Sequence, residues 1–77
     1  MIIKVKGNAI AVSTANTVSD STLVRIHATN AATITIAGET NGSFNMTANA
    51  VEIVEKLPTD TIAATAAVSC TPISYKA

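Results

Sequence analysis

The sequence predicts an all-β fold, a small antiparallel β-sandwich or barrel of about six to eight short strands. Three observations predict it. The chain contains nine Ile, seven Val and twelve Thr residues, and these β-branched side chains favour the pleated surface of a sheet over a helix. Several segments alternate apolar and polar residues with a period of two. Turn-forming Gly, Asn and Pro residues separate these segments.

Size and charge restrict the domain organisation and the classes of function. The length of 77 residues predicts one β domain over positions 1–77, with no linker inside it. Five Lys and Arg residues balance five Asp and Glu residues, so there is no basic excess to bind nucleic acid. The apolar tracts are too short to span a membrane or to form a signal peptide. We therefore expect neither nucleic acid nor membrane among the partners.

The composition predicts a thin hydrophobic core. Fourteen Ala residues add little packing volume, Trp is absent, and the aromatic side chains are one Phe and one Tyr. A domain this small often needs a disulfide, a metal or a partner surface for its stability. Since a single Cys excludes an intrachain disulfide, we expect a homo-oligomer or docking onto a larger protein surface.

The first two predicted strands are residues 2–6 and 9–12. They flank Gly7-Asn8, which is a two-residue hairpin signal. In a hairpin with that loop the apolar side chains share one face, while Lys4 and Lys6 share the other and protect an exposed edge. A single long strand kinked at Gly7 is the alternative.

A polar loop at residues 13–21 precedes the next predicted hairpin. Residues 22–28 and 33–37 alternate clearly and are predicted to be its strands. Their inward apolar residues then pair across a three-residue loop at 29–31, Val24 with Ile36 and Ile26 with Ile34.

Residues 43–47 are predicted to form the next strand. The pair Asn41-Gly42 could form a tight turn, but that turn would place Phe44 opposite Glu39. A five-residue loop at 38–42 instead brings the apolar residues together, pairing Ile36 with Phe44 and Ile34 with Met46. The tip of this loop, residues 39–41, is expected to be exposed.

Residues 48–57 permit two interpretations. Their apolar residues fit a helical spacing, and Glu52 and Lys56 form an i,i+4 pair. Strand alternation instead places apolar residues on one face, namely Val51, Ile53 and Leu57. We predict a strand, because the segment is short and Pro58 ends it.

The remaining chain is predicted to contain a turn and then more strand. Residues 57–60 have turn composition, and the Ala-rich residues 61–77 are predicted to form one or two strands. Pro72 has no backbone N–H, so we expect it at a sheet edge or a bulge.

The single His and the single Cys predict no chemistry. His27 alternates with Arg25 on a polar strand face and has no second metal ligand near it in the sequence, so a solvated or interface side chain is expected. Cys70 lacks the His and Asn partners of a thiol nucleophile, and it is expected to be a small buried side chain.

The carboxylates Glu52, Glu55 and Asp60 are the nearest approach to an acidic cluster. A catalytic pair must converge across a cleft, whereas Glu52 and Glu55 face opposite ways on a strand. Lys56 and Asp60 are expected to form an ion pair or to fix the turn. Tyr75 is expected to be a packing residue or an interface anchor. The sequence therefore predicts no catalytic, metal-binding or cofactor-binding residue, no cofactor and no enzyme.

Two stretches of the chain resemble a known class of proteins. The first reads Leu-Val-Arg-Ile-His-Ala-Thr-Asn at residues 23–30, followed by Ala-Thr-Ile-Thr-Ile at 32–36. The second comprises residues 42–47 and 51–62, and its most distinctive part is Glu-Lys-Leu-Pro-Thr-Asp-Thr at 55–61. Together they resemble small virion structural proteins of tailed phages, especially marine and cyanobacterial ones.

The resemblance implies a role on the virion. The protein would be a capsid decoration or cement protein, made in the host cytoplasm and located on the capsid surface. There it would bind the major capsid protein or other virion proteins, as a homo-oligomer, and stabilise the shell. A tail, neck or fibre component is the alternative within the same particle. A small glycan- or peptide-binding β module, with contacts from loops 13–21 and 38–42, is the alternative outside it.

Overall fold

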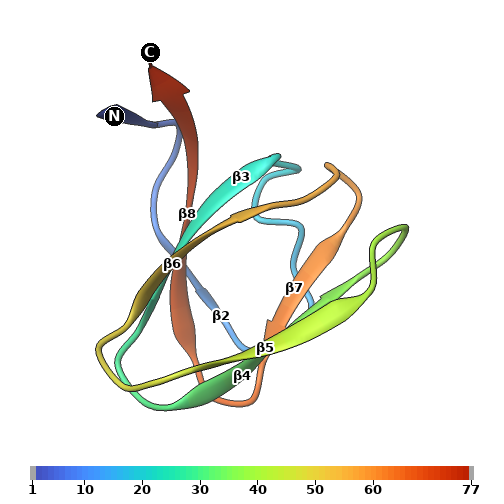
Figure 1. Cartoon of the computed structure of the whole chain (residues 1–77). Coiled ribbons are helices and arrows are strands. Elements are labelled where there is room, and N and C mark those ends of the chain that lie inside the picture. Colours follow the sequence, from blue (N-terminus) through green and yellow to red (C-terminus); the bar gives the residue numbers. More distant parts are fainter. Residues whose placement is uncertain (1, 77) are drawn as a thin grey trace.

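Eight short strands form two antiparallel sheets in the computed structural model, which describes residues 2–76 (Figure 1). The side chains of residues 2, 75 and 76 are outside this description. The strands are β1 (Ile2–Val5), β2 (Ile10–Val12), β3 (Leu23–Ala28), β4 (Ala32–Ala37), β5 (Gly42–Met46), β6 (Val51–Glu55), β7 (Thr61–Ala64) and β8 (Val68–Lys76). The predicted all-β class is confirmed, and the arrangement fits a small β-sandwich.

The five-stranded sheet begins with an interrupted edge strand. Its order is β1-β8-β3-β6, and β2 pairs with β8 beside β1. The predicted hairpin of residues 2–6 and 9–12 is therefore wrong, because β1 and β2 do not pair with each other. They are not one continuous strand either, but two separate strands that lie in turn along the same side of β8. The nine-residue β8 offers backbone partners to both segments in turn. A Cβ on Gly7 would lie 3.0 Å from Pro72 Cγ, so Gly7 permits a close approach here instead of a hairpin turn.

The predicted hairpin between the third and fourth strands is also wrong, although both strands form. β3 pairs with β6 and β8, whereas β4 lies in the three-stranded sheet of order β5-β4-β7. The inward rows of the two strands belong to one buried cluster. They meet across the core instead of side by side, because stacking two sheets buries both apolar faces at once.

The β4–β5 hairpin forms with a register shifted by two residues from the prediction. Ile34 lies opposite Phe44 and Ile36 lies opposite Gly42. The shift keeps every side chain on its predicted face, because strand side chains alternate with a period of two. The side chain of Asn41 closes the loop by bonding both backbone groups of Gly38. The tip at residues 39–41 is exposed, as predicted.

The second half of the chain follows the prediction closely. β6 is a strand and not a helix, the segment 57–60 forms a turn, and two strands follow it. Pro72 departs from the prediction, since β8 is an inner strand. The Pro72 carbonyl accepts a 2.9 Å hydrogen bond from the N–H of Lys6. The Pro72 nitrogen, which has no hydrogen to donate, therefore also faces the break between β1 and β2. No inner ladder bond is lost there.

The core between the sheets is aliphatic and thin. Its larger buried residues include Val12, Val18, Val24, Ile26, Ile34, Ile36, Met46 and Ile62. The predicted loop at 13–21 also contributes, because Val18 has no exposed surface. Val18, Ser19 and Asp20 all have positive φ angles of 53–58°, which is a costly conformation for a β-branched residue. Burial of the Val18 side chain and a 2.7 Å bond from its N–H to Asn16 Oδ1 hold this turn.

Candidate functional site

His27 and Cys70 lie on neighbouring strands but on opposite faces of the sheet. In the β3–β8 ladder His27 is opposite Ser69, and Cys70 is opposite Ile26. Cys70 has no exposed surface, which confirms the prediction of a buried side chain. Burial raises the pKa of the Cys70 thiol to about 11, so the thiol stays protonated and unreactive at neutral pH. The half-buried His27 on the outer face does not approach it.

The acidic residues do not converge on a common point. Glu52 and Glu55 occupy alternate faces of β6, as predicted, and both are exposed. Among the residues that the structure describes, no three His, Cys, Asp or Glu side chains are grouped so that they could hold a metal ion. The side chain of Tyr75, for which a packing or interface role was predicted, lies outside the described part.

Lys56 and Asp60 are buried together at the end of β6, with 4% and 0% of their surfaces exposed. Lys56 Nζ donates to the carbonyl oxygens of Ser21 at 2.7 Å and of Leu57 at 3.2 Å. The hydrogen bonds of Lys56 and Asp60 go mainly to backbone groups, so the two residues tie three segments of the chain together. We call this group the Lys56–Asp60 cluster.

Asp60 anchors two loops through one carboxylate. Its Oδ1 accepts the N–H groups of Glu39 at 2.8 Å and Thr40 at 3.2 Å, and its Oδ2 accepts that of Leu57 at 3.1 Å. The last bond closes the turn at 57–60, which confirms the turn-fixing role predicted for Asp60. Gly38 is required beside it, because Gly38 has a φ of 139° and an added Cβ would collide with Asp60 Oδ1.

The pKa values of the cluster reflect burial and these bonds. Burial opposes the charge on Asp60, but the N–H groups of Thr40, Leu57 and Glu39 and the Thr40 hydroxyl outweigh it and hold the pKa below its usual value. Burial lowers the pKa of Lys56, and the negative charges of Asp60 and Asp20 partly offset that effect. Asp60 is therefore a charged structural anchor at neutral pH.

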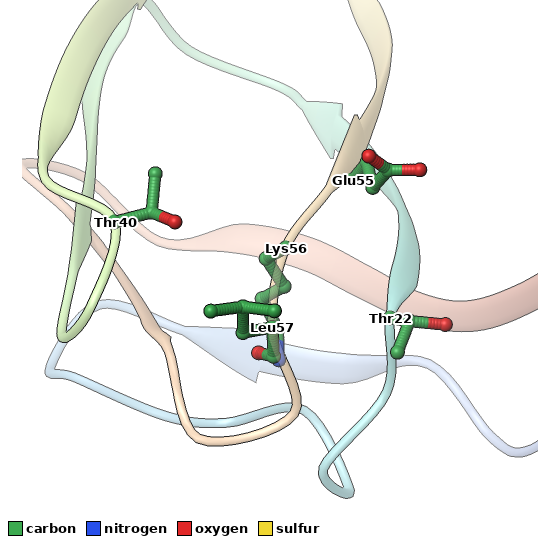
Figure 2. A pocket seen from close by; sticks show the side chains of 5 residues that line it. All are labelled: Thr22, Thr40, Glu55, Lys56 and Leu57. Atoms are coloured by element: carbon green, nitrogen blue, oxygen red, sulfur yellow. The ribbon is translucent and has the colours of Figure 1, made fainter.

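A cleft of about 460 Å³ lies beside this cluster and is lined by Thr22, Thr40, Glu55, Lys56 and Leu57 (Figure 2). Figure 2 shows Leu57 pointing toward the Thr40 loop, while Glu55 points away from it. The Lys56 ammonium is directed at two carbonyl oxygens. The cleft therefore offers a mixed wall of hydroxyl and aliphatic groups, without a nucleophile and base in mutual contact.

The exposed apolar surface gathers on β6, beside this cleft. Among the side chains that the structure describes, the large apolar ones that are exposed are Val51, Ile53, Leu57 and, elsewhere, Val5, with exposed fractions of 37–62%. β6 is an outer strand that pairs with β3. The side chains of Val51, Ile53 and Glu55 share the outer face of β6 and are exposed. We call these three residues the β6 edge.

The backbone of the β6 edge is open to a partner. The N–H of Lys56 donates to Thr22 and the carbonyl of Ala50 accepts from Ala28, so the even-numbered residues of this segment bond toward β3. In an antiparallel ladder the alternate residues then direct their N–H and C=O groups away from it. The sequence did not reveal this edge, because its position depends on the β3–β6 pairing, which no local pattern specifies.

Comparison of the chain with protein-family models, with curated proteins and with solved structures finds no match. Residues 2–76 contain no helix with the length and apolarity needed to cross a membrane. The surface and the sequence are therefore the basis for a functional proposal.

Proposed function

We propose that this protein is a non-enzymatic virion structural protein of a tailed phage, a decoration or cement protein on the outer capsid. It binds the major capsid protein or a neighbouring virion protein and stabilises the shell. The observation that carries the proposal is the β6 edge, an open strand with exposed Val51 and Ile53 in a molecule of zero formal net charge. Open apolar edges are sites where other chains add.

The use of the polar groups supports a structural role. The Lys56 ammonium and the Asp60 carboxylate are bound by backbone groups and hold loops together. The Cys70 thiol is protonated and buried. What remains for function is surface contact, and a surface with few charges can cover another protein without burying unpaired charge.

The distinctive segment of the phage resemblance coincides with the most unusual structure. Residues 55–61 include the end of the β6 edge and the Lys56–Asp60 cluster. The resemblance points to the virion, and the capsid is the location we propose. A lattice would also supply the contacts that the thin aliphatic core does not, since binding to the folded state raises its stability.

Addition of the purified protein to phage shells that lack it tests the proposal. We expect saturable binding, seen by cryo-electron microscopy as density on the outer shell, and a higher temperature of shell disruption. Density at the neck, tail or fibres of native particles would favour the alternative location. Failure to bind any part of the particle would contradict a virion role altogether.

The cleft favours one second candidate, a small peptide- or glycan-binding module. Thr22 directly follows loop 13–21 and Thr40 lies at the tip of loop 38–42, the two loops expected to make such contacts, and both residues line the cleft. Glycan sites usually present aromatic platforms, whereas this chain has one Phe and one Tyr. Saturable binding of a glycan or peptide by the isolated protein, lost in Thr40→Val, would support this candidate.

A further inference from the structure

We propose that two copies of this protein join through strand β6, antiparallel about a twofold axis at Ile53, so that their five-stranded sheets become one continuous sheet. This proposal concerns the free protein and does not depend on a location in a virion, and a virion protein that binds along the β6 edge would displace the second copy. It follows from a comparison of the sheet edges, from the backbone geometry of β6 and from the charges along it.

The other sheet edges are covered or blocked in the described part of the chain. β7 is covered by the segment before the Val18 turn, because Asn16 exchanges 2.8 and 3.0 Å bonds with Ile62. The β1–β2 edge is interrupted at Gly7-Asn8 and carries exposed Lys4 and Lys6, which oppose edge pairing. The β5 edge presents exposed Gly42, Ser43 and Asn45, and its one partly exposed apolar side chain, Phe44, packs against the core.

The β6 edge restricts which residues can pair. Val51, Ile53 and Glu55 direct their backbone groups outward, so they must lie opposite the same set in a second copy. With Ile53 opposite Ile53 of the second copy, Val51 lies opposite Glu55 on both sides of the axis. Each of these pairs can exchange two N–H···O bonds, and no outward backbone group of the strand is left without a partner.

Other registers are worse for reasons visible in the sequence and the structure. A slip of two residues in one direction places Glu52 opposite Glu52 of the second copy, and like charges directly opposite each other are destabilising. A slip of two residues in the other direction places Leu57 opposite Val51 of the second copy. The Leu57 N–H is already bonded to Asp60 Oδ2, and its carbonyl already accepts from Asp60 N and Lys56 Nζ. The register centred on Ile53 avoids both problems.

The charges of the outer face also favour a second copy as the partner. On this face Arg25 lies beside Ile53 and His27 lies beside Val51. The pairing brings Glu55 of the second copy onto the same face, opposite Val51. It then lies two strand spacings across and two residues along from Arg25, at a separation of roughly 12 Å. At low ionic strength, where screening is weak, Arg25 attracts this carboxylate. Ile53 meets its symmetry mate on the axis, and Val51 lies diagonal to Ile53 of the second copy.

Sedimentation of the purified protein over a wide dilution series tests the proposal. Because a single strand pair buries a small area, we expect a reversible, concentration-dependent dimer. In Ile53→Pro an outward N–H is removed while the β3 ladder is kept, and edge strands tolerate Pro. This variant is expected to stay monomeric at all concentrations with a β-type circular dichroism spectrum. A monomeric wild type, or a folded Ile53→Pro variant that still dimerises, would overturn the proposal.

Disulfide trapping tests the register and does not depend on the Pro variant. Facing residues of a hydrogen-bonded antiparallel pair have Cα atoms about 5.5 Å apart, which a disulfide can bridge. Oxidation of Ile53→Cys is therefore expected to yield a covalent dimer, whereas Ser43→Cys on the β5 edge provides the matched control and should yield little. Equal trapping of both variants, or none of Ile53→Cys at concentrations where the dimer sediments, would refute the twofold axis at Ile53.

Discussion

The β6 edge and the Lys56–Asp60 cluster are adjacent in the chain and depart from the usual burial pattern in opposite directions. The edge exposes Val51 and Ile53, at 43% and 37% of their surfaces, while the cluster buries a Lys and an Asp. Folded proteins ordinarily bury apolar side chains and expose charged ones. The difference lies in the partners. The buried charges have backbone partners within the molecule, so they are structural, whereas the exposed apolar side chains have none and are available to another chain.

Asp60→Ala should break the structural side of this comparison with the largest effect. The variant leaves the N–H groups of Glu39, Thr40 and Leu57 without their acceptor and removes the negative charge that acts most strongly on Lys56. We expect Tm to fall by more than about 8 °C in a thermal melt. Thr59→Ala, at the exposed neighbouring position, is the control and should shift Tm far less. Similar melts for both variants would show that the carboxylate is not an anchor.

Acid should weaken the same anchor to a smaller extent, because protonation removes the charge but leaves a carboxyl oxygen in place. The pKa of Asp60 is lower in the folded protein than in the unfolded chain. Its contribution to stability is therefore present above the unfolded pKa of roughly 3.9. It is lost as the pH falls through the folded pKa. Urea unfolding from pH 6 downward should show this loss, and the acid dependence should be weaker in Asp60→Asn.

Gly38→Ala should damage the cluster without removing either charge. The φ of 139° is strained for any residue with a Cβ, and the new methyl group would collide with Asp60 Oδ1. We expect a loss of about 1–3 kcal/mol in the free energy of unfolding. Gly42→Ala is the matched control, because no atom lies within 4 Å of its added Cβ. Denaturant unfolding of the two variants should differ clearly, and equal stabilities would contradict this account of Gly38.

Local patterns predicted the strands far better than their partners. Alternation located β3 and β4 because each buries one face, whereas the short length of its segment and Pro58 favoured a strand for β6. It could not tell whether Ile26 and Ile34 are neighbours in one sheet or face each other across two, since both arrangements bury the same atoms. The burial of Lys56 was equally hidden, because it depends on the Ser21 carbonyl, 35 positions away in the chain. The β6 edge became visible only once those long-range pairings were known.

Two matched Val→Thr substitutions on β6 sharpen the contrast between its faces. Val54 is half-buried and packs against the core, whereas Val51 on the opposite face is exposed. Threonine has nearly the same shape as valine, so the change mainly adds a hydroxyl. We expect Val54→Thr to cost about 1–3 kcal/mol and Val51→Thr to stay within about 0.5 kcal/mol, measured by urea unfolding at low protein concentration. Equal costs would mean that the two faces are buried alike.

Charge substitution at Val51 should produce the smallest effect and the one most specific to the proposed pairing. In the register centred on Ile53, Val51→Lys places a positive charge directly opposite Glu55 of the second copy, twice in each dimer, while Val51→Glu places a like charge there. Cross-strand charge pairs contribute roughly 0.2–1 kcal/mol each. Sedimentation at low salt should therefore show tighter association for Val51→Lys than for Val51→Glu, and the difference should shrink as salt screens the charges. Equal association of the two variants would indicate that Val51 does not face Glu55, because no other register places these two residues opposite each other.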